Sequence, residues 1–257
     1  MKLPKNKKVY FASDNHLGLN AELSSQEREK FFVKWLGEVS KDAAAIYLLG
    51  DLFDFWFEYK KVVPKGFVRV LGKLAELSDS GIPVTFFVGN HDLWMKDYFE
   101  KELGVKIQHN PIEIKINDTI FMIGHGDGLG PGDLGYKLMK KIFRNRFFQF
   151  LFSLIHPDVG IQLGNYFSQK NKLISGEKDV KFQGKEKEQL VEYCKRKLEE
   201  KHYNYFIFGH RHLPLQIDLD MNSFYINLGD WITHFTFGVF DGKSFFLEKW
   251  KNPIYND

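Results

Sequence analysis

The sequence contains a single cysteine, Cys194, and this scarcity sets the first limits on what the protein can be. One cysteine cannot form an intrachain disulfide, and the thiolate cluster of a structural zinc site is excluded as well. The residues around Cys194 are charged and follow a helical pattern, so we expect no redox role for it. A reducing, cytoplasmic compartment is therefore the expectation.

Long apolar runs and a strong excess of one charge are also missing. No run of about 20 apolar residues occurs, so no helix is expected to span a membrane. The chain enters an apolar strand pattern at Val9, which leaves too short and too polar a start for a signal peptide. The net charge is only +3, so a nucleic-acid partner is not expected.

The composition is that of a globular protein with a large amount of aromatic side chain. Of the 257 residues, 44% are hydrophobic and 27% are charged, which is enough for one large core and favours a single domain over residues 1–257. Twenty-six phenylalanines and five tryptophans exceed what a core usually requires. Some of them are therefore expected to line a ligand surface.

Strand and helix patterns alternate in the first half of the chain, and short strands follow near its end. The patterns predict helices over 25–39, 64–79 and 93–103, and strands over 9–13, 44–49, 83–88, 105–107, 112–116, 119–123 and 203–208. Residues 134–201 are helical, and because the core pattern resumes after them, we interpret them as an insertion. An α/β (α+β) fold of two packed sheets with helices on the outer faces fits this order.

Polar residues that can bind metals follow the apolar runs in five places. Each run ends where a strand would present its carboxyl end, which is where α/β folds place their chemistry. The five loops carry Asp14-Asn15-His16, Gly50-Asp51, Gly89-Asn90-His91-Asp92, Gly124-His125 and Gly209-His210-Arg211-His212. A glycine before a ligand lets the backbone turn sharply and approach an ion or a phosphate closely.

The loops together offer seven ligands that mix imidazole with oxygen, namely Asp14, His16, Asp51, Asn90, His125, His210 and His212. Such a set suits Mn, Fe or Zn. Seven ligands are too many for one ion and suit two ions that share a carboxylate, an arrangement that activates a hydroxide for phosphoryl transfer. The sequence therefore predicts a dinuclear phosphohydrolase centre. The remaining histidines are expected to be surface or hydrogen-bonding residues: His109, His156, His202 and His234.

The five motifs, in this order and spread from residue 9 to about residue 230, resemble those of calcineurin-like metallophosphoesterases. The resemblance implies a four-layer αββα sandwich with a helical insertion as a cap. It assigns one metal to Asp14, His16, Asp51 and His212, and the other to Asp51, Asn90, His125 and His210, so that Asp51 bridges them. It also implies that His91 acts on the leaving group, oriented by Asp92. An imidazole one position beyond a ligand could donate a proton to a departing alkoxide or stabilise phosphoryl charge.

Three stretches resemble a narrower group, the UDP-2,3-diacylglucosamine hydrolases of lipid A biosynthesis. They are Gly50–Trp56, His125–Leu129 with Tyr136 downstream, and Leu228–Trp231. The resemblance implies cleavage of a pyrophosphate to UMP and 2,3-diacylglucosamine 1-phosphate, with Mn²⁺ as the usual metal. It places Trp56, Asp133 and Tyr136 near the substrate.

The helical segment points to a lipid independently of the resemblance. Between Leu134 and Lys172 there are seven basic residues and a single acid, Asp158. Seven of the nine residues from Phe147 to Ile155 are apolar. A basic, aromatic-rich helix suits an anionic membrane surface or an acyl-chain cleft, whereas the alternative is a helix that packs on the core. We therefore expect residues 134–172 to contact the cytoplasmic face of the inner membrane.

His91 leaves the exact substrate open. The narrower group has arginine at this position, and a pyrophosphate, whose leaving group is a phosphate, hardly needs an acid. An enzyme that releases an alkoxide has a greater need for a general acid. A phosphomonoesterase or phosphodiesterase acting on another lipid or nucleotide is therefore the alternative. Gly132 also stands where the group often has an acidic residue. A non-catalytic scaffold of the same fold would be expected to have lost ligands, whereas every ligand type is present here.

Overall fold

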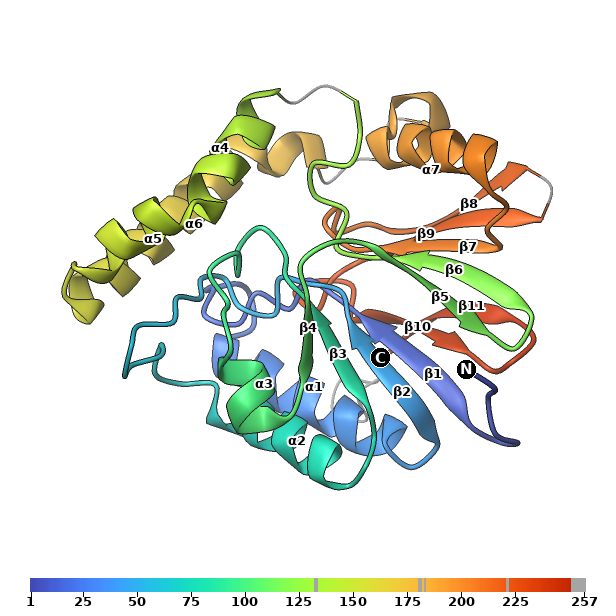
Figure 1. The fold of residues 1–257 in the computed structure, drawn as a ribbon, viewed down its shortest axis with the longest axis horizontal. Coiled ribbons are helices and arrows are strands. Elements are labelled where there is room, and N and C mark those ends of the chain that lie inside the picture. The colour runs from blue at the N-terminus through green and yellow to red at the C-terminus, as the bar shows by residue number, and fades with distance from the viewer. Residues whose placement is uncertain (132–133, 180–181, 183, 221, 251–257) are drawn as a thin grey trace.

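Two β-sheets lie face to face in the computed structural model, with helices on both outer faces (Figure 1). The structure describes residues 1–131, 134–179, 182, 184–220 and 222–250. This arrangement confirms the predicted four-layer αββα sandwich.

The first sheet has the strand order β11–β10–β1–β2–β3–β4. β1 to β4 run parallel to one another, and β10 pairs antiparallel with β1 and with β11. The carboxyl ends of β1, β2 and β3 therefore meet at one edge of the sheet. The bounds are β1 Lys8–Ala12, β2 Ala43–Leu48, β3 Val84–Phe87, β4 Lys106–Gln108, β10 Thr236–Phe240 and β11 Phe245–Lys249.

The second sheet has the order β5–β6–β7–β9–β8. Its three middle strands β6, β7 and β9 are parallel, and β5 and β8 pair antiparallel at its edges. The carboxyl ends of β6, β7 and β9 thus also share one edge. The bounds are β5 Ile112–Ile116, β6 Thr119–Ile123, β7 Tyr205–Phe208, β8 Pro214–Asp220 and β9 Ser223–Leu228.

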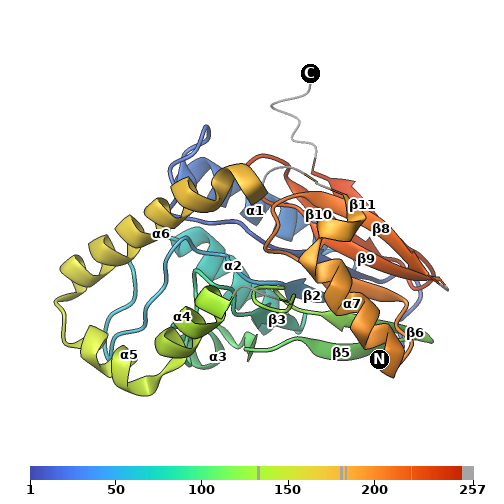
Figure 2. The same ribbon diagram turned by 90° about the horizontal axis from the view of Figure 1, so that it is seen from above.

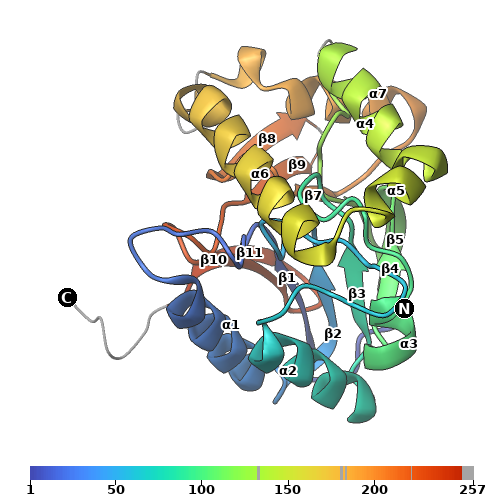
Figure 3. The ribbon, with the colours of Figure 1, turned by 90° about the vertical axis from the view of Figure 1, so that its left-hand side faces the viewer.

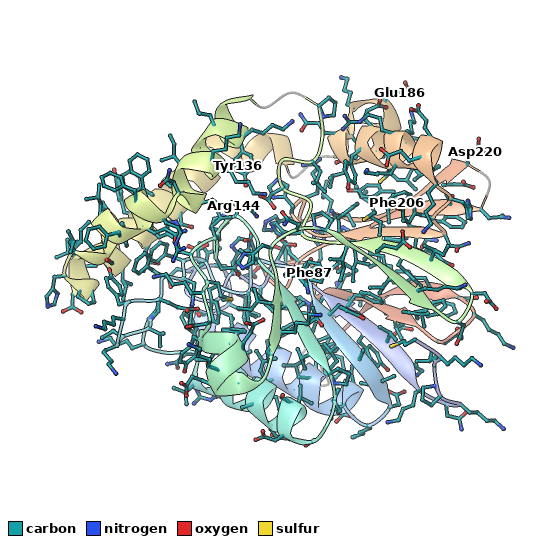
Figure 4. The ribbon with its side chains drawn as sticks, in the orientation of Figure 1. Phe87, Tyr136, Arg144, Glu186, Phe206 and Asp220 are labelled. Carbon is teal, nitrogen blue, oxygen red and sulfur yellow. The ribbon has the colours of Figure 1, made fainter. Side chains whose placement is uncertain are left out.

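Three apolar cores separate the four layers. Phe11 and Phe87 of the first sheet pack with Ile207 of the second in the middle core. Phe206 belongs to the core between the second sheet and α7 (Gln189–Glu200), together with Cys194 (Figure 4). The third core lies between the first sheet and α1 (Ser25–Val39), α2 (Val68–Asp79) and α3 (Tyr98–Leu103).

Two helices begin later than predicted. α1 starts as expected because Ser24 and Glu27 form a capping box, each accepting a hydrogen bond from the backbone N–H of the other. α2 was predicted from 64 and begins at Val68, where Glu29 of α1 accepts hydrogen bonds from two first-turn N–H groups at 2.9 and 3.1 Å. α3 was predicted from 93, and Glu58 similarly caps its later start. A carboxylate from a distant segment fixes both starts, so local patterning could not locate them.

The predicted insertion over 134–201 contains two different parts. α4 (Leu134–Arg144), α5 (Arg146–Ser153) and α6 (Pro157–Asp179) project beside the sandwich, whereas the short 3-10 helix Lys185–Lys187 leads into α7, which forms the fourth layer. Figure 2 shows α4 and α6 as two arms joined through α5, and Figure 3 shows these arms over the loops beside the sheets. Within the described ranges, every helix is too short or too polar to cross a bilayer.

Candidate metal centre

The five predicted loops meet where the carboxyl ends of the parallel strands of both sheets come together. The loops after β1, β2 and β3 supply Asp14, His16, Asp51 and Asn90, and the loops after β6 and β7 supply His125, His210 and His212. The structure brings all seven predicted ligands into two overlapping groups.

The first group surrounds the Asp14 carboxylate. Its Oδ1 lies 3.5 Å from His212 Nε2 and 3.9 Å from His16 Nε2, and His16 Nε2 is also 3.6 Å from Asp51 Oδ2. His16 presents Nε2 to these oxygens because its Nδ1 is 3.2 Å from Asp54 Oδ1. A carboxylate can only accept, so Nδ1 carries the proton and Nε2 keeps its lone pair for a metal.

The second group surrounds the Asn90 side-chain oxygen. Asn90 Oδ1 lies 3.0 Å from His125 Nε2 and 2.9 Å from His210 Nδ1. Asp51 Oδ2 is 3.2 Å from the same His125 nitrogen, so it approaches both groups. His125 Nδ1 donates to the carbonyl oxygen of Leu49 at 2.8 Å, which directs Nε2 toward the centre.

Two glycines next to the ligands allow this crowding. A Cβ on Gly89 would lie 2.2 Å from Asp51 Oδ1, and a Cβ on Gly50 would lie 2.5 Å from His125 Nδ1. Real Cβ atoms do not come this close to other atoms, so any side chain at these positions would displace a ligand. Glycine is therefore required because neighbouring loops touch.

The ligand backbones are strained. Ten non-glycine residues in the described chain have a positive φ, and half of them are predicted ligands: Asp14 (56°), His16 (44°), Asp51 (53°), His210 (71°) and His212 (54°). Such conformations cost roughly 1–3 kcal/mol each and gather at functional sites. Their concentration here indicates that the loops are shaped for the centre and not for chain stability.

Charge and burial shift the pKa values of two imidazoles, His125 and His210, in opposite directions. Burial opposes a charge on His125, yet the carboxylates of Asp51, Asp14 and Asp127 together outweigh burial and raise the pKa of His125 to about 10. Desolvation of the His210 ring, followed by repulsion from His125, lowers the pKa of His210 to about 3. His210 is thus a neutral imidazole that can bind a metal directly. His125 carries a proton that a metal would have to displace.

The donor set fits two divalent metals. Asp14 Oδ1 is buried and accepts no hydrogen bond from the described residues, although it faces two imidazole nitrogens. A buried carboxylate oxygen in this position is costly unless a cation completes its surroundings. The residues of the two groups provide carboxylate, amide and imidazole donors, which are the ligands of borderline divalent metals.

His91 lies against the centre and is held by one contact to Asp51, a candidate ligand, and by one to Asp54 outside the ligand set. Its backbone N–H donates to Asp51 Oδ1 at 2.8 Å, and its Nδ1–H donates to the carbonyl oxygen of Asp54 at 2.9 Å. Asp92, which was expected to orient His91, instead accepts hydrogen bonds from the backbone N–H groups of Gly89 (2.6 Å) and Leu52 (3.0 Å). Asp92 therefore ties two ligand loops together, and Asp54 takes over the contact with the ring.

The three predicted substrate residues differ in their surroundings. Trp56 is fully buried, and its indole N–H donates to Glu58 at 3.2 Å, so it packs the loop and offers no surface to a ligand. Tyr136 is half-buried on α4 (Figure 4), and its hydroxyl donates to Asp127 at 2.5 Å. Asp133 lies outside the described residues.

Sequence reasoning missed the role of Asp230. Asp230 Oδ2 lies 3.5 Å from His212 Nδ1, and Oδ1 accepts from three backbone N–H groups in residues 232–234. Although burial raises the pKa of Asp230, these contacts outweigh burial and lower it to about 2, so the group stays charged behind a ligand. The signal was present, because Gly229-Asp230 after β9 repeats the pattern of Gly50-Asp51 after β2.

Comparison with known proteins agrees with this geometry. A family model described as calcineurin-like phosphoesterase matches residues 7–214, and the chain belongs to this family. Within it, the chain is 37% identical to a UDP-2,3-diacylglucosamine hydrolase of Porphyromonas gingivalis (strain ATCC BAA-308 / W83), over 94% of this chain and 97% of that protein. It is 26% identical to a hydrolase of the same name from Histophilus somni (strain 129Pt), over 88% and 92% of the two chains.

Among solved structures, the phosphoesterase Yfce of E. coli matches 93% of this chain and 90% of its own, with a TM-score of 0.45 and 14% identity. Family membership and the clustered ligands together make the protein a metal-dependent phosphoester hydrolase that uses divalent metals.

Proposed function

We propose that the enzyme hydrolyses the pyrophosphate bond of UDP-2,3-diacylglucosamine and releases UMP and 2,3-diacylglucosamine 1-phosphate. The observation that carries this proposal is the 37% identity to a hydrolase of that name. The similarity extends over 94% of the chain, so it includes the helical segment as well as the metal loops. A shared metal centre alone would support only phosphoester hydrolysis in general.

Mn²⁺ is the proposed metal in both positions, with Fe or Zn as the alternatives. The first position would be held by Asp14, His16, Asp51 and His212, and the second by Asp51, Asn90, His125 and His210. When bound, the pair would supply an activated hydroxide and neutralise charge on the phosphoryl oxygens. The shared Asp51 and the buried oxygen of Asp14 support this assignment.

His91 is the proposed catalytic residue beside the metals. Its Nδ1 is engaged by the Asp54 carbonyl, so Nε2 is the nitrogen left to face the centre. His91 also forms, with His16 and Asp51, a group whose ligand atoms lie within 4.8 Å of one another. From there the imidazole can hydrogen-bond a phosphoryl oxygen or protonate the leaving oxygen. Asp92 contributes by holding the His91 loop against the Asp51 loop.

Tyr136 is the proposed substrate contact next to the centre, and Asp133, which lies outside the described residues, is a proposed substrate contact from the resemblance alone. Tyr136 and Lys140 both donate to the Asp127 carboxylate, two residues beyond the ligand His125. Lys140 also lines a small cavity of about 50 Å³ together with His125 and Asp127. A positive charge at this place suits a phosphate of the substrate.

The projecting helices are the proposed contact with the lipid and the inner membrane. α5 has no buried residue, and Phe147, Phe150 and Leu154 are 61%, 58% and 68% exposed. Large apolar side chains this exposed, with lysines and arginines along the same helices, suit an anionic bilayer surface. The enzyme would then act from the cytoplasm, bound peripherally to the cytoplasmic face of the inner membrane.

The decisive assay combines the purified chain, Mn²⁺ and UDP-2,3-diacylglucosamine dispersed in detergent. Release of UMP, followed by chromatography, with the sugar 1-phosphate identified by ³¹P NMR, is the expected result. Absence of UMP at high enzyme concentration, with good turnover of bis(p-nitrophenyl) phosphate, would refute the proposed substrate. The assignment as a phosphoesterase would then still hold. Parallel reactions with Fe²⁺ and Zn²⁺ identify the preferred metal.

One observation favours a second function, hydrolysis of another lipid or nucleotide phosphomonoester or diester. His91 stands where the narrower group has arginine, and an imidazole acid is most useful when the leaving group is an alkoxide. Faster turnover of an alkyl phosphodiester or monoester than of the UDP lipid at equal concentration would establish this second function.

A further inference from the structure

A serine of the projecting helices reaches the edge of the metal centre. Ser168 lies on α6, is only 8% exposed, and comes from a segment that no ligand motif includes. Its Oγ is 2.8 Å from Asp54 Oδ2 and 3.0 Å from His91 Nδ1. Asp54 in turn holds the metal ligand His16 through its other oxygen.

The donor and acceptor roles in this contact are fixed by chemistry. The Asp54 carboxylate can only accept, so the Ser168 hydroxyl donates its proton to Asp54. A lone pair of the same hydroxyl then faces His91 Nδ1, whose N–H is shared between Ser168 and the Asp54 carbonyl. The hydroxyl thus completes a chain from the His91 ring to the Asp54 carboxylate.

Close packing sets the position of α6 over this chain. A Cβ on Gly164 would lie 2.4 Å from the ring of Phe55, and a Cβ on Gly160 would lie 2.1 Å from the hydroxyl oxygen of Tyr59. Positions 160, 164 and 168 follow one another at intervals of four, so they share one helix face. That face rests on residues 54–59 of the loop after β2, and Ser168 is where it meets His91.

We propose that Ser168 is a positioning residue through which the projecting helices hold the His91 ring in its working orientation. The proposal rests on the catalytic role of His91 proposed above. Besides offering an apolar surface, the helices then complete the reaction centre itself. A substrate that shifts α6 would also shift the contact that aligns His91.

A double-mutant cycle tests this proposal with the Mn²⁺-loaded full chain. Ser168→Ala is expected to lower kcat roughly three- to tenfold with KM nearly unchanged, since one hydrogen bond to the ring is lost. In a His91→Ala background the same change should have no further effect, because Ser168 acts only through His91. An equal loss in both backgrounds would show that Ser168 merely anchors α6, and would overturn the proposal while leaving the role of His91 intact.

Control variants separate orientation from folding. Ser40→Ala removes a half-buried hydroxyl at the end of α1, which donates to the carbonyl of Gly37, and should leave kcat unchanged. Ser168→Cys keeps the volume of the side chain but weakens its hydrogen bonds, so it replaces Ser168→Ala if the alanine variant does not fold. A near-normal rate of His91→Ala alone would instead refute the proposed function of His91.

A spectroscopic measurement does not depend on the substrate. In ¹⁵N-labelled, metal-free protein, the Nδ1–H proton of His91 should exchange slowly with water and give a signal that His91→Ala removes. Ser168→Ala should shift that signal or broaden it through faster exchange, whereas Ser40→Ala should not. An identical His91 signal in wild type and Ser168→Ala would overturn the proposal.

Discussion

At the scale of single residues, Asp51 is the side chain on which both ligand groups depend. Its Oδ2 lies 3.6 Å from His16 Nε2 and 3.2 Å from His125 Nε2. Asp51→Ala should therefore lower kcat by at least roughly 10³-fold and reduce the bound metal, as measured by elemental analysis. Asp118→Ala, in the exposed turn between β5 and β6, should change neither. An Asp51→Ala enzyme with full metal content would contradict the bridging role.

Metal binding should depend on pH through His125. Because the pKa of His125 is raised to about 10 without metal, the ring is protonated below that pH and a metal must displace the proton. Affinity for Mn²⁺ should therefore rise with pH between 6 and 9, by up to about tenfold per unit from this group. Titration calorimetry at pH 7.5 in two buffers of different ionisation enthalpy should detect roughly one proton released. Binding without proton release would be inconsistent with this pKa.

The sequence predicts the candidate ligands, which cluster in the structure, but it does not predict the contacts that hold them. Aspartate and histidine after apolar runs are visible in the chain, and all seven predicted ligands cluster. The left-handed backbone at five of them could not be predicted, because Asp and His carry no local preference strong enough to impose it. The contact between Ser168 and Asp54 joins residues 114 positions apart, so only the folded chain shows it.

At the scale of elements, α5 is the segment whose function is easiest to separate from folding. Replacing Phe147, Phe150 and Leu154 by serine should reduce binding to phosphatidylglycerol vesicles by roughly tenfold or more, since about 25 cal/mol per Å² of apolar burial is lost. The melting temperature should stay within about 2 °C, because none of the three is buried.

The control and the kinetic readout use the same protein preparations. Val68→Ser removes a side chain that is 74% exposed at the start of α2, away from the projecting helices, and should leave vesicle binding intact. Turnover of bis(p-nitrophenyl) phosphate by the triple variant should match wild type. Equal losses on this soluble ester and on a lipid substrate would mean that α5 supports the core.

The sequence patterns predicted which segments are helices and which are strands. They predicted where a helix starts only when the residues that cap it are its neighbours in the sequence. The capping box of Ser24 and Glu27 is a sequence pattern, and α1 begins as expected. The caps of α2 and α3 come from Glu29 and Glu58, which lie about 40 residues before the groups they bind. The role of α7 as a fourth layer was also not visible, because its apolar face looked like part of the helical insertion.

At the scale of the whole molecule, the candidate metal centre joins the two sheets. Four candidate ligands follow strands of the first sheet and three follow strands of the second, on loops with strained backbones. Removing the metals with EDTA should lower the melting temperature by about 5–10 °C, since a ligand at 100 times its Kd adds about 2.7 kcal/mol. Calorimetry with and without Mn²⁺ measures the shift. An unchanged melting temperature would mean that the loops keep their shape without metal.

The position of the last ligand loop also has a consequence for the time at which the enzyme becomes active. Each proposed metal takes one histidine from the loop after β7, His210 or His212, whereas all the other proposed ligands precede that loop in the chain. A growing chain therefore cannot complete either metal position until residue 210 has left the ribosome, and it cannot complete both until residue 212 has. By then α4 to α6 have already emerged, so the surface proposed to meet the membrane exists before the chain can hydrolyse anything there.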